Sequence, residues 1–111
     1  MPLVSLLASI TSPEDLALFS HAHSRDHDEI DRALAARGIA PIVLPLDPIA
    51  LTDGGASWLL RHQQKHFEMN IALGLTGEDM TRLDLRRRDE LESFVAINFG
   101  EHDSARLALG I

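Results

Sequence analysis

Apolar and histidine side chains recur every three or four residues in three stretches of the chain, which is the spacing of one face of an α-helix. The first stretch follows Ser12, a residue typical of helix N-caps, and Pro13, which suits a first helical turn; Gly38 provides the stop signal. We predict one long helix of about 25 residues here, with a break near Ser24 as the alternative. The repeating face consists of Leu16, Phe19, His23, His27, Ile30 and Leu34.

Two further helices are predicted in the rest of the chain. One begins at Ala56 or Ser57 and stops before Gly74, and the other extends from about Arg88 to Leu109, where Gly110 ends it. The repeating face of the first of these helices consists of Trp58, Leu59, His62, His66, Met69, Asn70 and Leu73. That of the second consists of Leu91, Phe94, Val95, Asn98, His102, Ala105 and Leu109. Between them, Thr76–Asp79 is similar to a capping sequence, which predicts a short helical turn to about Leu83.

The segments outside these helices predict an extended connection and an N-terminal arm. Residues 39–53 contain Pro41, Pro45 and Pro48, which favour extended backbone and disfavour both a helix and a central strand. The apolar arm, residues 1–11, is expected to dock on the domain or on a neighbouring subunit. The predicted fold class is all-α: a three-helix bundle with a proline-rich extended crossover and a short extra helical turn, in a single domain of residues 12–111.

The composition excludes several classes of function. The chain of 111 residues has no cysteine, which rules out disulfides, thiolate nucleophiles and cysteine-based metal sites. A formal net charge of −7 argues against nucleic acid as the main partner, because an acidic surface repels phosphates. The apolar run of residues 3–10 is too short to span a bilayer, so no membrane role is predicted.

The chain has six histidines, and the helical periodicity places five of them on the inward faces of the three predicted helices. They occur with asparagines in pairs four residues apart, which places each pair on one side of its helix. We call this set the polar seam; its members are His23, His27, His62, His66, Asn70, Asn98 and His102. His21 is expected to point elsewhere.

The polar seam has more than one interpretation. Buried side chains that hydrogen-bond to one another, or an interface with another subunit, are the favoured explanations, and such layers can fix helix register. The alternative is a zinc site with His62, His66 and His102 as ligands. Glu101 is the one evident inward carboxylate, and the carboxylate motifs of di-iron bundles are absent from the sequence. No serine or threonine is evidently paired with a histidine and a carboxylate, so no enzymatic activity is predicted.

Two smaller features have ordinary explanations. The basic run of Arg86, Arg87 and Arg88 is followed by acidic residues, which indicates a solvated or salt-bridged turn rather than a nucleic-acid contact. Trp58 near a helix start is expected to anchor the core.

Two stretches of the chain resemble a group of small proteins encoded by tailed bacteriophages and prophages. The first is the pattern Trp-x-x-x-His-Gln-x-x-His-x-x-Met-Asn, which begins at Trp58, and the second is Glu101-His102 near the closing Leu109-Gly110-Ile111. Looser matches at Ser12-Pro13, His23/His27 and Leu46-Asp47-Pro48 extend the resemblance from about residue 12 to the end of the chain. The resemblance implies a phage origin and a place among particle or morphogenesis proteins, and it implies no particular chemistry.

The function predicted from these observations is that of a structural or accessory protein of a tailed phage, or of a related particle such as a gene transfer agent. It would act in the head, neck or tail through contacts with other particle subunits or with copies of itself, after assembly in the bacterial cytoplasm. This prediction requires no cofactor. The alternatives are a zinc-binding helical bundle and a soluble phage regulator of a host protein.

Overall fold

The described part of the chain forms three α-helices. The structure, a computed structural model, describes residues 13–40 and 53–111, with side chains from Leu18 onward. The helices are α2 (Pro13–Ala36), α3 (Ala56–Leu73) and α4 (Arg88–Leu109), and these two described ranges contain no strand. The all-α prediction and the three predicted helices are confirmed, and α2 continues without a break through Ser24. The predicted N-terminal arm, the Ser12 cap and residues 41–52 of the proline-rich crossover lie outside the described residues.

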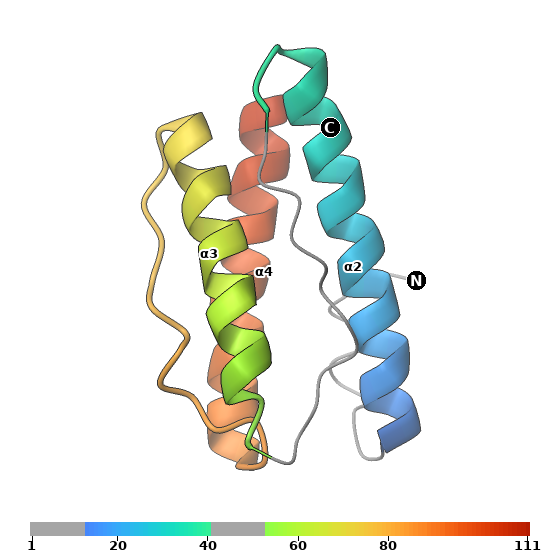
Figure 1. Cartoon of the computed structure of the whole chain (residues 1–111), viewed down its shortest axis with the longest axis vertical. Coiled ribbons are helices and arrows are strands. Elements are labelled where there is room, and N and C mark those ends of the chain that lie inside the picture. Colours follow the sequence, from blue (N-terminus) through green and yellow to red (C-terminus); the bar gives the residue numbers. More distant parts are fainter. Residues whose placement is uncertain (1–12, 41–52) are drawn as a thin grey trace.

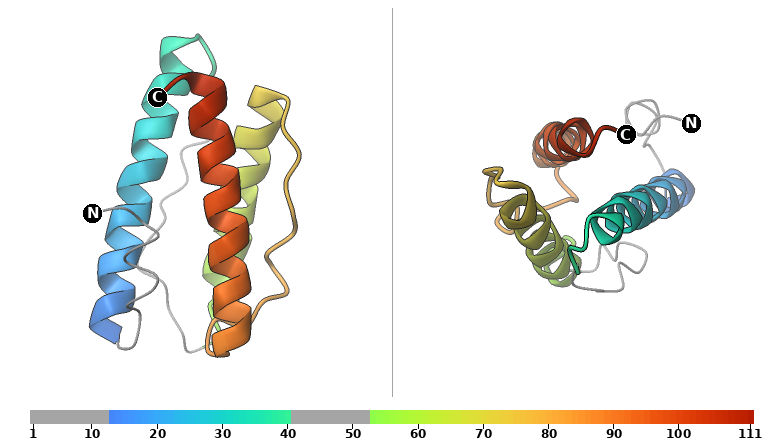
Figure 2. Two further views of the ribbon diagram at one scale, coloured as in Figure 1. Left: turned by 180° about the vertical axis from the view of Figure 1, so that it is seen from behind. Right: turned by 90° about the horizontal axis from the view of Figure 1, so that it is seen from above.

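The three helices run in the same direction. In Figure 1, each begins at the lower end of the molecule and ends at the upper end. Seen from above in Figure 2, they occupy the corners of a triangle, with the interior shared by all three. The extended segment after α3 returns along the outside of the molecule to the start of α4, as Figures 1 and 2 both show. Because the helices are parallel, the residue numbers increase in the same direction along all three. A step of one turn therefore moves to the next level of the bundle on every helix.

Local signals fix where α3 begins and where α3 and α4 end. Asp53 caps the start of α3, because its carboxylate accepts the backbone N–H groups of Gly55 and Ser57 at 3.1 Å each. Gly74 and Gly110 follow the ends of α3 and α4 with left-handed backbone angles, φ +68° and +72°. Glycine adopts this conformation at little cost, so the predicted stop signals work as expected.

The predicted short helical turn between α3 and α4 is wrong, because residues 75–87 contain no helix. Several backbone N–H groups there donate to side chains rather than to helical carbonyls. Glu78 N–H donates to Glu101 Oε2 at 3.0 Å, Met80 N–H to Gln63 Oε1 at 2.8 Å, and Thr81 N–H to Asp79 Oδ1 at 2.8 Å. The capping-like residues therefore form an Asx turn within an extended segment that is tied to α3 and α4.

Two apolar clusters fill the bundle on either side of a polar middle. The cluster toward the helix starts contains Phe19, Trp58, Leu59, Met80, Leu85 and Phe94, and the cluster toward the helix ends contains Ile30, Leu34, Met69, Ala105 and Leu109. The predicted role of Trp58 as a core anchor is confirmed, since its side chain is 1% exposed. The polar residues between the clusters are enclosed by apolar side chains at both ends, in a setting where unpaired polar groups are costly.

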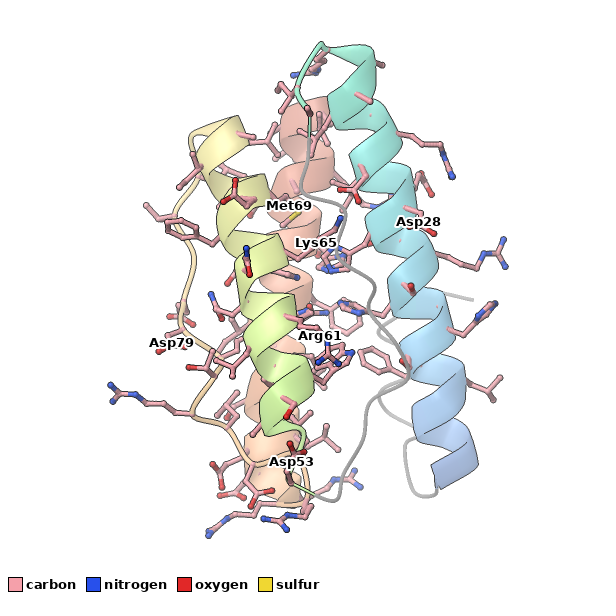
Figure 3. All side chains as sticks on the ribbon, viewed as in Figure 1. Asp28, Asp53, Arg61, Lys65, Met69 and Asp79 are labelled. Carbon is pink, nitrogen blue, oxygen red and sulfur yellow. The ribbon has the colours of Figure 1, made fainter. Side chains whose placement is uncertain are left out.

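Charged side chains link α2 to the other two helices around this middle. Lys65 of α3, labelled in Figure 3, forms an ion pair with Asp31 of α2. Arg106 of α4 contacts Asp26 and Glu29 of α2 at 3.0 Å each. Both links join helices that are far apart in the sequence, and they hold α2 at a defined height against its neighbours.

Candidate metal centre

All seven residues of the polar seam are buried, as the helical periodicity predicted. The five histidines among them, His23, His27, His62, His66 and His102, are each 2% exposed or less. His21 is exposed, in agreement with the prediction that it points elsewhere. One ring nitrogen from each of the five histidines lies within 4.8 Å of the corresponding nitrogen of every other. The helices thus bring residues from three parts of the chain into one cluster.

The cluster consists of two layers, each with one residue from each helix. The layer toward the helix starts contains His23, His62 and Asn98. His23 Nε2 and His62 Nε2 are 3.2 Å apart, and they lie 3.0 and 2.9 Å from Asn98 Oδ1. We call these three atoms the first triangle.

The next layer lies one helical turn further along every helix and contains His27, His66 and His102. Their Nε2 atoms form a second triangle, in which His66 lies 3.2 Å from His27 and 3.1 Å from His102. The third side, between His27 and His102, is also 3.1 Å. Three imidazole nitrogens therefore meet at one point on the bundle axis, each supplied by a different helix.

Two carboxylates lie behind the second triangle, that of Glu101, which is buried, and that of Asp26, which is half-buried. Glu101 Oε1 accepts a hydrogen bond from His66 Nδ1 at 3.0 Å and another from the amide of Asn70 at 2.9 Å. Asp26 Oδ2 contacts His102 Nδ1, and its other oxygen contacts Arg106. Each carboxylate thus faces a ring nitrogen on the side away from the triangle. Carboxylates in this position orient metal-binding histidines in many proteins.

These carboxylates determine which nitrogen of each ring carries the proton. An ionised carboxylate only accepts hydrogen bonds, so Nδ1 of His66 and Nδ1 of His102 must each carry a hydrogen. In a neutral ring Nε2 then has a lone pair and no hydrogen. With both rings in the neutral form that binds metals, the 3.1 Å contact between Nε2 of His66 and Nε2 of His102 brings two lone pairs together. No hydrogen bond connects two such atoms, whereas a cation placed between them accepts both lone pairs.

The electrostatics of the site favour neutral rings and ionised carboxylates. Burial lowers the pKa of His66 to about 4, although the hydrogen bond to Glu101 acts in the opposite direction. Burial and the neighbouring histidines also hold the pKa values of His23, His27 and His62 well below the usual range. Neutral imidazole is the form that binds metals.

The two carboxylates respond to burial in the opposite sense. Burial alone would raise the pKa of Glu101, but hydrogen bonds from His66, Glu78 and Asn70 outweigh it and lower the pKa. For Asp26 the effect of burial is likewise outweighed, by His102 and Arg106, and the pKa is lowered. Both groups are therefore anions at neutral pH, and they place two negative charges beside the buried rings.

The zinc ligands proposed from the sequence do not form one triangle. His66 and His102 are neighbours, but the third nitrogen beside them belongs to His27, while His62 Nε2 contacts His23 and Asn98. Spacing within each helix identified the ring pairs, but it could not show which pair members share a height. That relation depends on the parallel course of the helices.

Other site residues are placed as follows. Glu101, the one carboxylate that the sequence suggested, is at the site, and Asn70 contacts Glu101 rather than the rings. Asp26 was missed because it lies beside the apolar face of α2 rather than on it. Its position next to His27 was the available signal.

The arginine run of residues 86–88 is exposed, and its side chains pair with Asp84, Glu90 and Glu92, as a salt-bridged turn.

No protein-family model matches the chain, and no curated protein or solved structure shows significant similarity to it. Among the described residues, no helix has both the length and the apolar character needed to cross a membrane. Function must therefore be inferred from the site itself.

Proposed function

We propose that this protein binds a divalent transition-metal ion between its three helices through the buried histidines. The observation that carries the proposal is the meeting of three imidazole nitrogens: the Nε2 atoms of His27, His66 and His102 lie 3.1–3.2 Å from one another. Nitrogens that bind one transition-metal ion at about 2.0–2.1 Å lie about 2.8–3.4 Å apart, from octahedral coordination at the lower end to tetrahedral coordination at the upper end. The second triangle, with sides of 3.1–3.2 Å, lies within that range.

Charge supports the same function. Imidazole ligands are neutral, so a divalent ion brings two positive charges into a space closed by apolar clusters. The carboxylates of Asp26 and Glu101 balance these charges through the rings that they contact. The orienting carboxylates also make the attached imidazoles better electron donors. An ion held in this way would join α2, α3 and α4 at one point, which is a structural role and requires no catalysis.

Metal analysis of the untagged protein tests this proposal directly. Protein purified with divalent metals in the medium is expected to retain about one equivalent of metal, and a chelator should lower its melting temperature. His66→Ala should abolish retention because it removes one corner of the second triangle. His21→Ala, which removes an exposed histidine outside the cluster, is the matched control. Metal-free wild-type protein that melts at the same temperature with and without added metal would contradict the proposal.

We also propose that the protein is an accessory subunit of a tailed-phage or phage-like particle, assembled in the bacterial cytoplasm. An exposed apolar line on α3 supports a function through protein contacts: Leu60 is 64% exposed, Phe67 57% and Ile71 60%. Their spacing of seven and four residues places them on one side of the helix. Together with the resemblance to phage proteins, this line supports contact with a neighbouring subunit of the particle.

Mass spectrometry of gradient-purified particles tests this second proposal. The protein is expected at a fixed stoichiometry, and Phe67→Asp should reduce its incorporation while leaving metal retention intact. Absence of the protein from intact particles would refute the proposal. Absence combined with specific capture of one host protein would favour the regulator that the sequence left open.

A further inference from the structure

We infer that the ion has six ligands, one nitrogen from each of the five buried histidines and the side-chain oxygen of Asn98, in an octahedral arrangement. This inference rests on the proposed metal binding and goes beyond it, because it fixes the coordination number and the class of metal. It also assigns a ligand, Asn98, that is neither a histidine nor an acidic residue.

The two triangles have the dimensions of opposite faces of an octahedron. The sides of the first triangle are 2.9, 3.0 and 3.2 Å, and those of the second are 3.1, 3.1 and 3.2 Å. An octahedron with edges of 2.9–3.2 Å has its centre about 2.1–2.3 Å from every corner. This is close to the length of metal bonds to imidazole nitrogen and amide oxygen. The two triangles come from layers one helical turn apart, and the five histidine nitrogens all lie within 4.8 Å of one another, close enough to surround one ion.

The ring positions distinguish adjacent corners from opposite ones. Adjacent rings have centroids 4.1–5.7 Å apart, the shortest being the pair His62 and His66 and the longest the pair His27 and His62. His23 and His66, in different layers and on different helices, are 6.4 Å apart and nearly parallel, at 17°. Two rings on opposite sides of one ion have this relation. The corner opposite His27 is then the one that Asn98 Oδ1 occupies.

The surroundings of Asn98 favour a ligand role over a simple polar bridge. Asn98 is fully buried, and its Oδ1 lies at ligand-to-ligand distance from two imidazole nitrogens. Its amide nitrogen has no hydrogen-bond partner in the structure. An asparagine that serves only as a hydrogen-bonding residue in a core usually has partners for its amide hydrogens as well, whereas here only the oxygen is engaged. Coordination of Oδ1 to an ion supplies a reason for keeping this side chain in the core.

Six neutral donors select a particular class of ion. Structural zinc sites are almost always tetrahedral, whereas an octahedral set of imidazoles suits divalent iron, cobalt or nickel. The hard cations magnesium and calcium prefer oxygen ligands, and this set offers one oxygen. We therefore assign the site to an octahedral first-row divalent ion, with all six positions filled by the protein and none left for a substrate.

Visible absorption of the cobalt(II)-loaded protein tests the coordination number, because six-coordinate cobalt(II) absorbs weakly and four-coordinate cobalt(II) absorbs strongly. Wild-type protein is expected to bind one equivalent of cobalt(II) with weak absorption. Asn98→Leu removes the oxygen and fills its space, so cobalt(II) should lose a ligand, the absorption should rise severalfold, and the preference for nickel(II) over zinc(II) should fall about tenfold. Gln64→Leu removes an exposed side-chain amide of the same size class from α3, outside the cluster, and should leave the spectrum weak.

The outcomes separate this inference from the proposal beneath it. Strong, tetrahedral absorption in the wild-type protein would overturn six-coordination while supporting metal binding through three histidines. An unchanged spectrum in Asn98→Leu would overturn the role of Asn98. Failure to bind any cobalt(II) or nickel(II) would overturn metal binding itself. If Asn98→Leu does not fold, Asn98→Asp provides a second variant: it keeps an oxygen donor, and the inference requires weak absorption and tighter binding.

Discussion

The Nε2 atoms of His66 and His102 lie 3.1 Å apart, while the other nitrogen of each ring faces a carboxylate. This arrangement depends on the direction of the helices, on the carboxylates beside the rings and on the positions of the ring protons. Parallel helices bring the two residues to one height, the carboxylates fix the protons on the outer nitrogens, and the inner nitrogens are left as electron donors.

Glu101→Gln is expected to weaken metal binding about 10–100-fold while the protein stays folded. The glutamine keeps the volume of the side chain but removes the charge that faces His66 Nδ1. Competition titration against a chelator measures the affinity. Glu78→Gln, which removes an exposed carboxylate from the adjoining segment, is the control and should change the affinity less than twofold. Equal effects of the two substitutions would show that only net charge matters.

Gly77→Ala should disturb the site from outside the helices. A Cβ atom at residue 77 would lie 2.7 Å from Glu101 Oε1 and 2.5 Å from the amide nitrogen of Asn70, so one of these groups must move. We expect a loss of about 1–3 kcal/mol in the free energy of unfolding, together with weaker metal binding. Gly100→Ala is the matched control, because no atom lies within 4 Å of its added Cβ and alanine favours the helix. Denaturant unfolding with and without metal checks both effects.

Trp58 provides an internal probe of metal binding. It is the one tryptophan of the chain, and its ring is stacked on that of His62 with centroids 4.6 Å apart. Paramagnetic nickel(II) or cobalt(II) at the site should quench its fluorescence and saturate at one equivalent. Zinc(II), which has a filled d shell, should quench far less, and excess zinc(II) should raise the nickel(II) concentration needed for quenching. Quenching that fails to saturate would indicate weak surface binding instead.

The metal-free protein is expected to lose stability as the pH falls from about 7 to 4. Four of the buried histidines have folded pKa values below the unfolded value of about 6.5, so below that pH the unfolded state binds more protons. Each such ring contributes stability that is present above pH 6.5 and is lost as the pH falls toward its folded pKa, which is about 4 for His66. The lowered pKa values of Asp26 and Glu101 act in the same direction at still lower pH.

Urea unfolding at pH 8, 7, 6 and 5 in the presence of a chelator measures this dependence. The free energy of unfolding should fall by more than about 1 kcal/mol per pH unit below pH 6.5, because several rings titrate together. His21→Gln should leave the slope unchanged. A flat profile between pH 7 and 5 would mean that the rings are not held neutral in the folded protein.

The sequence alone predicts the helices and most of the buried polar residues. Steps of three and four residues identified α2, α3 and α4, and the glycines marked their ends, because both signals act within a few neighbouring residues. The same periodicity placed His23, His27, His62, His66, Asn98 and His102 inside. The segment 75–87 could not be predicted in this way, since its backbone is bound by side chains of distant residues such as Gln63 and Glu101.

Which histidines group into each triangle also could not be predicted from the sequence. Whether His62 or His27 joins His66 and His102 depends on the direction and height of α2 relative to α3, and both are tertiary properties. Asp26 could not be identified as a site residue for a related reason. Its role depends on contact with His102, which is 76 positions away in the chain. Periodicity shows which side chains turn inward, and contacts across the bundle decide which of them meet.

The second triangle joins residues that are 36, 39 and 75 positions apart in the chain. An ion held there would close two long loops at once, and loop closure restricts the unfolded chain more than the folded one. In a protein without cysteine, such an ion would restrict the unfolded chain as two disulfide cross-links would. Unlike disulfides, these cross-links would be independent of the redox state of the surroundings and would be released by acid or by competition for the metal.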